Sequence, residues 1–387
     1  MREKCPICNS EDKIIIKSIQ LTVPEYFHLP NKYDIVTCNA CGFCYASTKA
    51  TLEDYEYYYS HCNSYSGTPT QSKEKLKFNN RIVEYITNLA NQDSTFLDIG
   101  FGKGHLMRLL RKKGFSNVYG IDPALESIIQ MQEEGFIVYK GSIFDDVRTD
   151  LKGKFDFVFL FDVLEHLLYP NVAIENASGY LNRNGYLIIG VPNYAVLFDD
   201  HSILVNQFNQ EHINYFSAIS LDNLLKSKGF FRVNNLNSEN LVSESEKGLL
   251  AVFRFDKMER NYGCRRILKD EICKKSIETY IQRNNELEQV VNNKLIYFGK
   301  DNACVYVWGT GAYAMWLLSN TKMKDMNIQA FIDNNSSKIG KKLIGKPIIS
   351  AEQACENIPI IICSMRFSHE IVQQIKESHM LNTYLVI

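Results

Sequence analysis

A glycine-rich turn between a short strand and a helix limits the fold of this chain more than any other feature. Residues 95–99 form an apolar strand that ends in an acid, residues 100–104 read Gly-Phe-Gly-Lys-Gly, and residues 105–112 have the leucine spacing of an amphipathic helix. This succession opens an α/β layer and lets a ligand lie against bare backbone at the carboxyl end of the strand. It predicts a parallel, doubly wound sheet.

The acid before the first glycine indicates the charge of the ligand. A glycine pattern alone also fits a dinucleotide site, but a carboxylate at Asp98 would repel a pyrophosphate, whereas it suits the cationic, phosphate-free S-adenosylmethionine. A second strand, residues 118–121, ends at Asp122, where a carboxylate can accept both ribose hydroxyls. The cofactor residues expected from the pattern are Asp98, Gly100, Gly102, Gly104 and Asp122.

The alternation of strands and helices continues beyond this unit. Residues 155–160 are the apolar run of a buried parallel strand, and residues 162–166 follow at its carboxyl end, where active sites of open sheets lie. Residues 185–192 give the next strand. Ser220 is expected to cap a helix over residues 221–228.

Four cysteines near the start of the chain have the spacing of a metal site. They form two Cys-x2-Cys pairs, and two such turns complete a tetrahedral four-sulfur site for zinc, or iron in its place. The predicted ligands are Cys5, Cys8, Cys38 and Cys41. Because four thiolates leave no open coordination position, the metal is expected to be structural.

The last part of the chain repeats the strand-turn-helix pattern. Residues 303–308 form a strand followed by Gly309 and Gly311, and residues 328–332 form another that ends at Asp333. Here no acid precedes the glycines, so the turn is compatible with a pyrophosphate at a helix N-terminus. A docking domain that keeps the fold without a ligand is an equal alternative.

Composition and charge limit the classes of binding partner that we expect for this chain. The 387 residues carry a net charge of −1, and this balance offers no basic field for nucleic acid. No long apolar run or signal peptide is visible, so we expect a cytoplasmic protein that binds neither nucleic acid nor membrane. The expected regions are a four-cysteine domain (1–70), a cofactor domain (71–256), a helical connector (257–300) and a Rossmann-like domain (301–387).

Three segments resemble signatures of class I S-adenosylmethionine-dependent methyltransferases, in the family's order. They are residues 96–104 (FLDIGFGKG), residues 163–167 (VLEHL), and residues 211–217 (EHINYFS) followed by residues 224–230 (LLKSKGF). The resemblance implies that Ser142 and Ile143 flank adenine and that Phe161 faces the cofactor.

The order of the regions resembles the three-domain nucleotide-sugar methyltransferases of bacteria, especially sugar C-methyltransferases. The resemblance implies a zinc-binding N-terminal domain and a sugar carried on a nucleoside diphosphate, as in surface polysaccharide biosynthesis. The glycine turn and acid of the last region would then contact the substrate through Gly309, Gly311 and Asp333. In that family a Tyr-Ser loop closes over the acceptor, which implies an aromatic lid at residues 57–65 that includes Tyr65. A packed linker is the alternative for this stretch.

The chemistry of methyl transfer depends on the polar rim of the central sheet. The family's Tyr-x-Glu-His segment corresponds to residues 209–212, where Glu211 and His212 match but the tyrosine is replaced by Asn209. We therefore expect O-methylation, with His212, Glu211 and His166 as catalytic residues, and C-methylation through an enediolate as the alternative. A divalent Fe, Mn or Mg ion on His166, Asp199, His201 and His212 is a further expectation. A non-catalytic binding protein that keeps the fold is the remaining alternative.

Overall fold

The computed structural model describes residues 2–24, 27–61, 73–200, 202–233, 248–255, 267–364 and 367–387. These residues form two compact units, each built from separated stretches of the chain. The first unit comprises Met1–Ile16, Val36–Asp199 and Glu211–Ile277. The second unit comprises Lys17–Ile35, Asp200–Gln210 and Glu278–Ile387. The four sequence regions named above stay a prediction.

A seven-stranded sheet in the order β10-β11-β8-β7-β4-β5-β6 is the centre of the first unit. Its strands are β4 (Phe96–Ile99), β5 (Val118–Asp122), β6 (Ile137–Lys140), β7 (Phe155–Phe161), β8 (Leu181–Pro192), β10 (Phe230–Arg232) and β11 (Gly248–Phe255). The strands from β6 to β8 run parallel, whereas β11 pairs antiparallel with β8 and β10 antiparallel with β11. The predicted parallel strands are therefore present, and an antiparallel pair is added at one edge.

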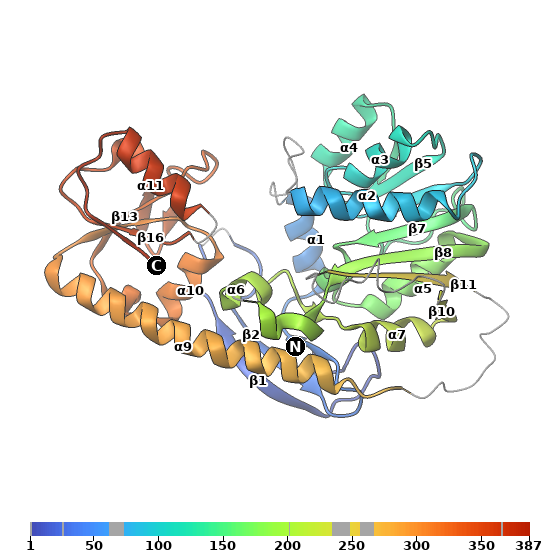
Figure 1. Cartoon of the computed structure of the whole chain (residues 1–387), viewed down its shortest axis with the longest axis horizontal. Helices are drawn as coiled ribbons and strands as arrows, with labels where there is room; N and C mark the ends of the chain where they lie inside the picture. The colour runs from blue at the N-terminus through green and yellow to red at the C-terminus, as the bar shows by residue number, and fades with distance from the viewer. Residues whose placement is uncertain are drawn as a thin grey trace. The chain divides into compact units, whose positions relative to one another are not determined.

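Helices cover both faces of this sheet (Figure 1). One face carries α2 (Lys73–Thr87), α3 (His105–Lys112) and α4 (Leu125–Glu133), and the other carries α5 (Pro170–Tyr180) and α7 (Ala218–Lys226). Successive strand residues alternate between the two cores: Phe159 packs with the first group of helices, and Leu160 packs with the second. This alternation follows from the period of a strand, and it explains why β7 is apolar from Phe157 to Phe161.

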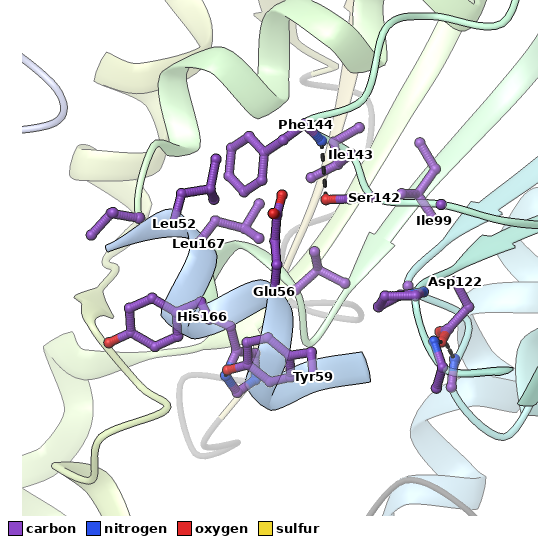
Figure 2. A pocket seen from close by; sticks show the side chains of 18 of the residues that line it. Leu52, Glu56, Tyr59, Ile99, Asp122, Ser142, Ile143, Phe144, His166 and Leu167 are labelled. Carbon is purple, nitrogen blue, oxygen red and sulfur yellow. Dashed lines mark hydrogen bonds between the residues drawn. The ribbon is translucent and has the colours of Figure 1, made fainter. Parts of the chain in front are cut away.

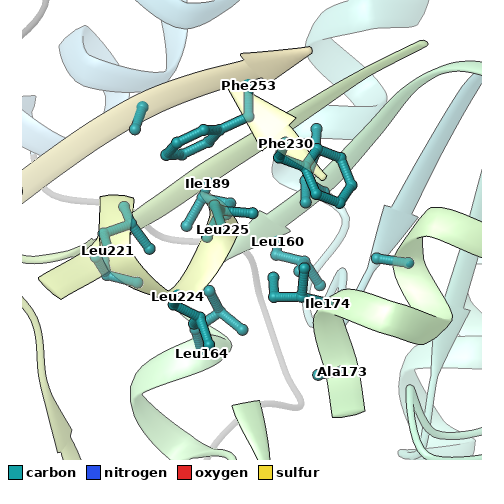
Figure 3. Close-up of a cluster of buried hydrophobic side chains, with 14 of the residues drawn as sticks. Leu160, Leu164, Ala173, Ile174, Ile189, Leu221, Leu224, Leu225, Phe230 and Phe253 are labelled. Atoms are coloured by element: carbon teal, nitrogen blue, oxygen red, sulfur yellow. The ribbon is translucent and has the colours of Figure 1, made fainter. Parts of the chain in front are cut away.

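The core under α7 shows how a helix is fixed on the sheet (Figure 3). Leu221, Leu224 and Leu225 of α7 are fully buried, and they share one apolar cluster with Ile189 of β8 and Phe253 of β11. The helix begins at Ala218 because Ser217, not Ser220, is its N-cap. Ser220 instead returns a hydrogen bond to the Ser217 backbone, in a capping box. The predicted cap was therefore three residues late.

A smaller sheet in the order β1-β2-β3-β9 contains the segment around the cysteines. Its strands are β1 (Lys13–Gln20), β2 (Lys32–Cys38), β3 (Cys44–Ser47) and β9 (Asn214–Tyr215), and β3 pairs antiparallel with β9. Because β9 follows His212 directly, this sheet fixes a segment of the predicted catalytic rim. Other short elements of the chain are α1 (Leu52–His61), η2 (Leu164–His166), η3 (Tyr194–Asp199) and α6 (Leu204–Gln207).

The second unit has a six-stranded sheet in the order β14-β15-β13-β12-β16-β17. Its strands are β12 (Val305–Trp308), β13 (Ile328–Ile332), β14 (Lys342–Leu343), β15 (Lys346–Ile349), β16 (Ile360–Ile362) and β17 (Tyr384–Val386). Its other elements are α10 (Ala312–Asn320), η5 (Lys322–Asp325), η6 (Ala351–Gln353) and α11 (Ser368–Glu377). The parallel β13, β12 and β16 at its centre match the predicted Rossmann-like arrangement.

The helical connector was predicted over residues 257–300, and the helix that the structure describes there begins at residue 271. The long helix α9 spans Glu271–Asp301, and residues 256–266 lie outside the described part of the chain. Among the described helices, none has the length and apolar character needed to cross a bilayer.

Candidate active site

The glycine turn after β4 has the backbone geometry that its sequence predicts. Gly100, Gly102 and Gly104 have φ angles of 74°, 50° and 66°, in the left-handed region that favours glycine. A Cβ on Gly100 would lie 2.6 Å from Cγ2 of Val163, whereas a Cβ on Gly102 would meet nothing within 4 Å. The turn is thus packed on one side and open at Gly102, where a ligand can approach the backbone.

A cavity that is partly open to solvent lies at the carboxyl ends of β4, β5 and β7 (Figure 2). Its wall contains Gly100, Gly102, Asp122 and, from the loop after β6, Ser142 and Ile143. The remaining lining residues are Leu52, Tyr55, Glu56, Tyr59, Ile99, Pro123, Ala124, Gly141, Phe144, Asp162, Val163, His166, Leu167 and Leu168. Five of the predicted cofactor residues therefore share one cavity.

Asp122 is held at the edge of this cavity by the turn itself. Its Oδ2 accepts a hydrogen bond from the Gly102 amide at 2.8 Å, and its Oδ1 accepts one from the Ala124 amide at 2.8 Å. Each carboxylate oxygen can accept more than one bond, so the group can still accept from a diol. Burial raises the pKa of Asp122 despite these amide donors.

Asp98 lies deeper and is not part of the cavity wall. Burial, with the nearby charge of Asp122 as a second cause, raises the pKa of Asp98 to about 8. Two buried carboxylates side by side favour a cationic ligand, because a positive charge stabilises both in their ionised forms. This is the property that the sequence argument for a sulfonium donor requires.

Of the three further residues predicted to contact the cofactor, two line the cavity and one does not. Ser142 and Ile143 line the cavity beside Phe144, and Asn176 Nδ2 donates to the Ile143 carbonyl at 2.7 Å. This side is apolar enough to hold a base. Phe161 is half-buried and packs against Gly190, and it does not line the cavity.

One wall of the cavity comes from α1, far from the glycine turn in sequence (Figure 2). Leu52, Tyr55, Glu56 and Tyr59 have helical spacing and all line the cavity. Of the stretch predicted as a tyrosine lid, residues 57–61 are the end of α1 and Tyr59 lines the cavity; closure over an acceptor stays a prediction. Tyr65 lies outside the described residues.

The predicted catalytic histidines meet at the end of this cavity. The rings of His166 and His212 lie edge to face with centroids 4.9 Å apart, and His166 lines the cavity wall. Nδ1 of His166 is 3.0 Å from the Tyr59 hydroxyl and 3.1 Å from the Glu211 carbonyl. Burial lowers the pKa of His166, and burial together with the charge of His166 lowers that of His212 to about 3. Both rings are therefore neutral near pH 7, the form in which an imidazole binds a metal ion.

Tyrosine hydroxyls surround the rest of this rim. The Tyr58 hydroxyl donates to Oε1 of Glu211 at 2.7 Å, and the Tyr194 hydroxyl lies 3.2 Å from Nδ1 of His212. The rim thus combines two imidazoles, one carboxylate and several phenols, a set that can take and return protons.

The metal ligands predicted at this rim are only partly brought together. Glu165, His166 and His212 each offer one donor atom, and these atoms lie within 4.8 Å of one another. Glu165 was not predicted as a ligand, although its position next to His166 was a signal in the sequence. His201 and the side chain of Asp199 lie outside the described residues.

A buried arginine near the start of the chain supports the same rim. Arg2 Nη1 donates to the Ile213 carbonyl at 3.1 Å, and Nη2 donates to Oδ1 of Asn214 at 2.8 Å. Asn214 Nδ2 in turn donates to the carbonyls of Leu164 and Leu167 at 2.8 and 2.7 Å. This chain of bonds ties η2, which carries His166, to the strand after His212. Sequence reasoning missed both Arg2 and Asn214, because a lone arginine or asparagine has no distinctive spacing.

The four N-terminal cysteines form one compact cluster. The Sγ atoms of Cys5 and Cys41 are 3.6 Å apart, those of Cys8 and Cys38 are 3.4 Å apart, and all four lie within 4.8 Å of one another. A tetrahedral zinc site with Zn–S bonds of about 2.3 Å needs sulfurs roughly 3.8 Å apart, so the donor set fits the ion. Gly42, with φ of 75°, donates its amide to the Cys38 carbonyl at 2.8 Å and closes the second turn.

The second unit places its predicted substrate residues at one sheet edge. Gly309 has φ of 108°, and Gly311 is the N-cap of α10 with nothing within 4 Å of its ideal Cβ position. Asp333, at the end of β13, accepts from the Thr310 amide at 3.1 Å and from Lys338 Nζ at 3.2 Å. The pKa of Asp333 is lowered because hydrogen bonds from Thr310 and Asn335 and the Lys338 charge outweigh burial. The turn and the acid thus lie together.

Comparison with known families agrees with this site. Residues 72–233 match a family described as a methyltransferase domain, and residues 301–387 match one described as C2185-like, N-terminal. The first match contains the glycine turn, Asp122 and both histidines.

Similar proteins match the central part of the chain. A tRNA U34 carboxymethyltransferase of Vibrio cholerae is 30% identical over 181 residues, which is 43% of this chain and 53% of that protein. The mitochondrial ubiquinone biosynthesis O-methyltransferase of Saccharomyces cerevisiae is 29% identical over 151 residues, 36% of this chain and 42% of that protein. The chain thus spans about half the length of these curated relatives. A solved magnesium protoporphyrin IX methyltransferase from Synechocystis, with bound SAH, aligns with 14% identity and a TM-score of 0.40, covering 53% of this chain and 100% of that one.

Proposed function

We propose that this chain, whose residues 72–233 form a class I S-adenosylmethionine-dependent methyltransferase domain, methylates a hydroxyl of a sugar carried on a nucleoside diphosphate. The observation that carries the proposal is the meeting of His166, which lines the donor cavity, with the His212 ring and the Glu211 backbone carbonyl. The donor supplies an activated methyl group, and the chain must align an acceptor with it and remove the acceptor's proton. His212, or a metal ion at the same rim, would prepare that hydroxyl.

The donor side of the proposal is supported by charge and shape. Asp98 and Asp122 are buried carboxylates that favour a cation, and Gly102 leaves the backbone open to it. Ile143 and Phe144 provide apolar surface for adenine beside Ser142, and Asp122 provides the acceptor for ribose. Tyr55 and Tyr59 of α1 add apolar surface that keeps water away from a sulfonium.

The acceptor class is supported by the second unit and by the resemblance described above. Gly311 is the N-cap of α10 and has open space beside it, at a helix start where an anion is favoured. Asp333 lies beside this helix start and can accept from a ribose of the nucleotide. The proposed pathway is the synthesis of a surface polysaccharide or a related glycan.

Methylation of a sugar carbon is the second candidate, and one observation favours it. Asn209 stands where the resembled family has tyrosine, but the Tyr58 hydroxyl donates to Glu211 and the Tyr59 hydroxyl lies beside His166. Acid-base help beyond one histidine is therefore present, as an enediolate intermediate requires.

The test is to incubate the purified full chain with S-adenosylmethionine labelled in its methyl group and a panel of nucleotide sugars, hydroxyl and keto forms included. Transfer RNA and unactivated sugars complete the panel. We expect label in a nucleotide sugar, and product NMR then places the methyl on oxygen or carbon. Label in RNA alone would refute the proposed acceptor class. Formation of no methylated product from any acceptor would favour a binding protein.

Paired variants test the rim. His212→Ala is expected to lower turnover by roughly 100-fold or more while S-adenosylmethionine still binds. His369→Ala, at an exposed site of the second unit, is the matched control and should behave as the unaltered chain. Unchanged turnover in His212→Ala would remove its catalytic role.

A further inference from the structure

Three donor side chains converge at the rim of the donor cavity in a way that acid-base catalysis alone does not require. Glu165 and His166 are adjacent in η2, and His212 comes from the loop before β9. One donor atom of each lies within 4.8 Å of the other two, and Nε2 of His166 is 3.8 Å from Oε1 of Glu165. Glu165 is only 1% exposed, so its carboxylate is directed into the protein rather than into solvent.

Both imidazoles are oriented through their Nδ1 atoms. Nδ1 of His166 lies against the Glu211 carbonyl and the Tyr59 hydroxyl, and Nδ1 of His212 lies against the Tyr194 hydroxyl. Histidines that bind metals commonly engage the other ring nitrogen in this way, which fixes the tautomer and directs Nε2 to the ion. The geometry therefore assigns Nε2 of each ring as the ligand.

We propose that Glu165, His166 and His212 bind a divalent cation of the manganese or ferrous type, with open positions toward the donor cavity. Two histidines and one carboxylate leave coordination sites open and suit these ions. His166 lines the cavity, so the ion stands where an acceptor meets the methyl donor. The ligand set differs from the sequence prediction by including Glu165.

The bound ion would take part in methyl transfer, and this part of the proposal rests on the proposed function. A sugar hydroxyl bound to the cation loses its proton more readily. The proton passes to the carboxylate of Glu211, which already accepts from Tyr58. The oxygen then forms its bond to the methyl carbon as the carbon–sulfur bond breaks, and neutral S-adenosylhomocysteine leaves. In this scheme His212 is a ligand and not the base.

Manganese is the probe that separates this site from the cysteine cluster, because Mn²⁺ prefers oxygen and nitrogen ligands to thiolates. The full chain is treated with chelator, given zinc for its cysteines, and titrated with Mn²⁺ while the electron paramagnetic resonance signal of the free ion is followed. We expect a single tight site in the unaltered chain. Glu165→Gln and His212→Gln should each weaken it by roughly 100-fold or more.

Controls keep the outcome interpretable. His369→Ala should bind Mn²⁺ like the unaltered chain, and calorimetry with S-adenosylmethionine shows whether each variant still folds its donor site. If Glu165→Gln no longer binds S-adenosylmethionine, its Mn²⁺ affinity is set aside. The Mn²⁺ affinity of His212→Gln, a change at a half-buried side chain, then decides whether the site exists. Absence of a Mn²⁺ site in the unaltered chain, or equal affinity in the folded variants, overturns the proposal. Tight Mn²⁺ binding without methylation of any nucleotide sugar would leave the metal site intact and refute the proposed acceptor.

Discussion

The buried carboxylate of Asp98 makes donor binding depend on pH, and the size of the effect follows from the structure. Burial and the neighbouring Asp122 raise the pKa of Asp98 to about 8, so the empty site is largely protonated at neutral pH. A cationic donor favours the ionised form, and its apparent affinity is reduced by the fraction of chains that are ionised. That fraction is roughly one in a hundred at about pH 6 and close to one at about pH 9, so affinity should rise by roughly 100-fold over this range.

Calorimetry measures this effect directly. S-adenosylmethionine is titrated into the chain at several pH values, and buffers of different ionisation enthalpy report the protons released. The donor's own amino group ionises in the same range, so the informative quantity is the affinity of the unaltered chain divided by that of Asp98→Asn. We expect this ratio to increase steeply from about pH 6 to about pH 9, with release of about one proton near neutral pH. A ratio that does not change with pH would falsify the assignment of Asp98 to the donor site.

The raised pKa of Asp98 also makes the stability of the folded chain depend on pH. Because the pKa of Asp98 is higher in the folded chain than its ordinary value of 3.8, its contribution to stability is complete below that value and is lost as the pH rises through about 8. The empty Asp98→Asn chain should therefore be more stable than the unaltered chain at alkaline pH, and added donor should reverse the order. Urea denaturation with and without S-adenosylmethionine checks both statements.

Three other changes test the surroundings of the site. Gly100→Ala forces a side chain into positive φ, 2.6 Å from Val163, and should cost roughly 1–3 kcal/mol of unfolding free energy in urea; a cost near zero would show that the turn is not constrained. Asn214→Ala leaves two backbone carbonyls of the η2 turn without their donor and should cost roughly 2–5 kcal/mol, with a loss of turnover beyond the loss of folded protein; normal turnover would separate Asn214 from the rim. Cys38→Ser should abolish zinc retained through dialysis, measured by elemental analysis, while Cys355→Ser, at an exposed cysteine outside the cluster, should retain it; equal zinc in both variants would refute the four-sulfur site.

Elements with a strong local pattern could be predicted from the sequence. The strand Phe96–Ile99, the helix His105–Lys112 and the strand ending at Asp122 appear where their residues indicated, because apolar strands and glycine turns specify them locally. The start of α7 was predicted from Ser220, although Ser217 forms the cap. Both serines are adequate caps in isolation, and only the burial of Leu221 and its neighbours selects between them.

Contacts between distant segments could not be predicted in the same way. The contact of Tyr59 of α1 with His166 and the bonds from Arg2 to the segment after His212 join residues more than a hundred positions apart. No periodicity in the sequence encodes such pairings, because they depend on how the small sheet packs beside the large one. Glu165 is an intermediate case: it stood next to a predicted ligand, and only the fold brings its carboxylate within 4.8 Å of donor atoms of His166 and His212.

The helix α1 has a consequence for any attempt to shorten this protein. Residues 72–233 correspond to the recognisable methyltransferase domain, yet Leu52, Tyr55, Glu56 and Tyr59 lie before that range and form a side of its donor cavity. A fragment cut at the family boundary would keep the glycine turn and both carboxylates but leave the nucleoside exposed to solvent along one flank. A fragment that keeps this side of the cavity therefore has to begin before Leu52, outside the range that the family match covers.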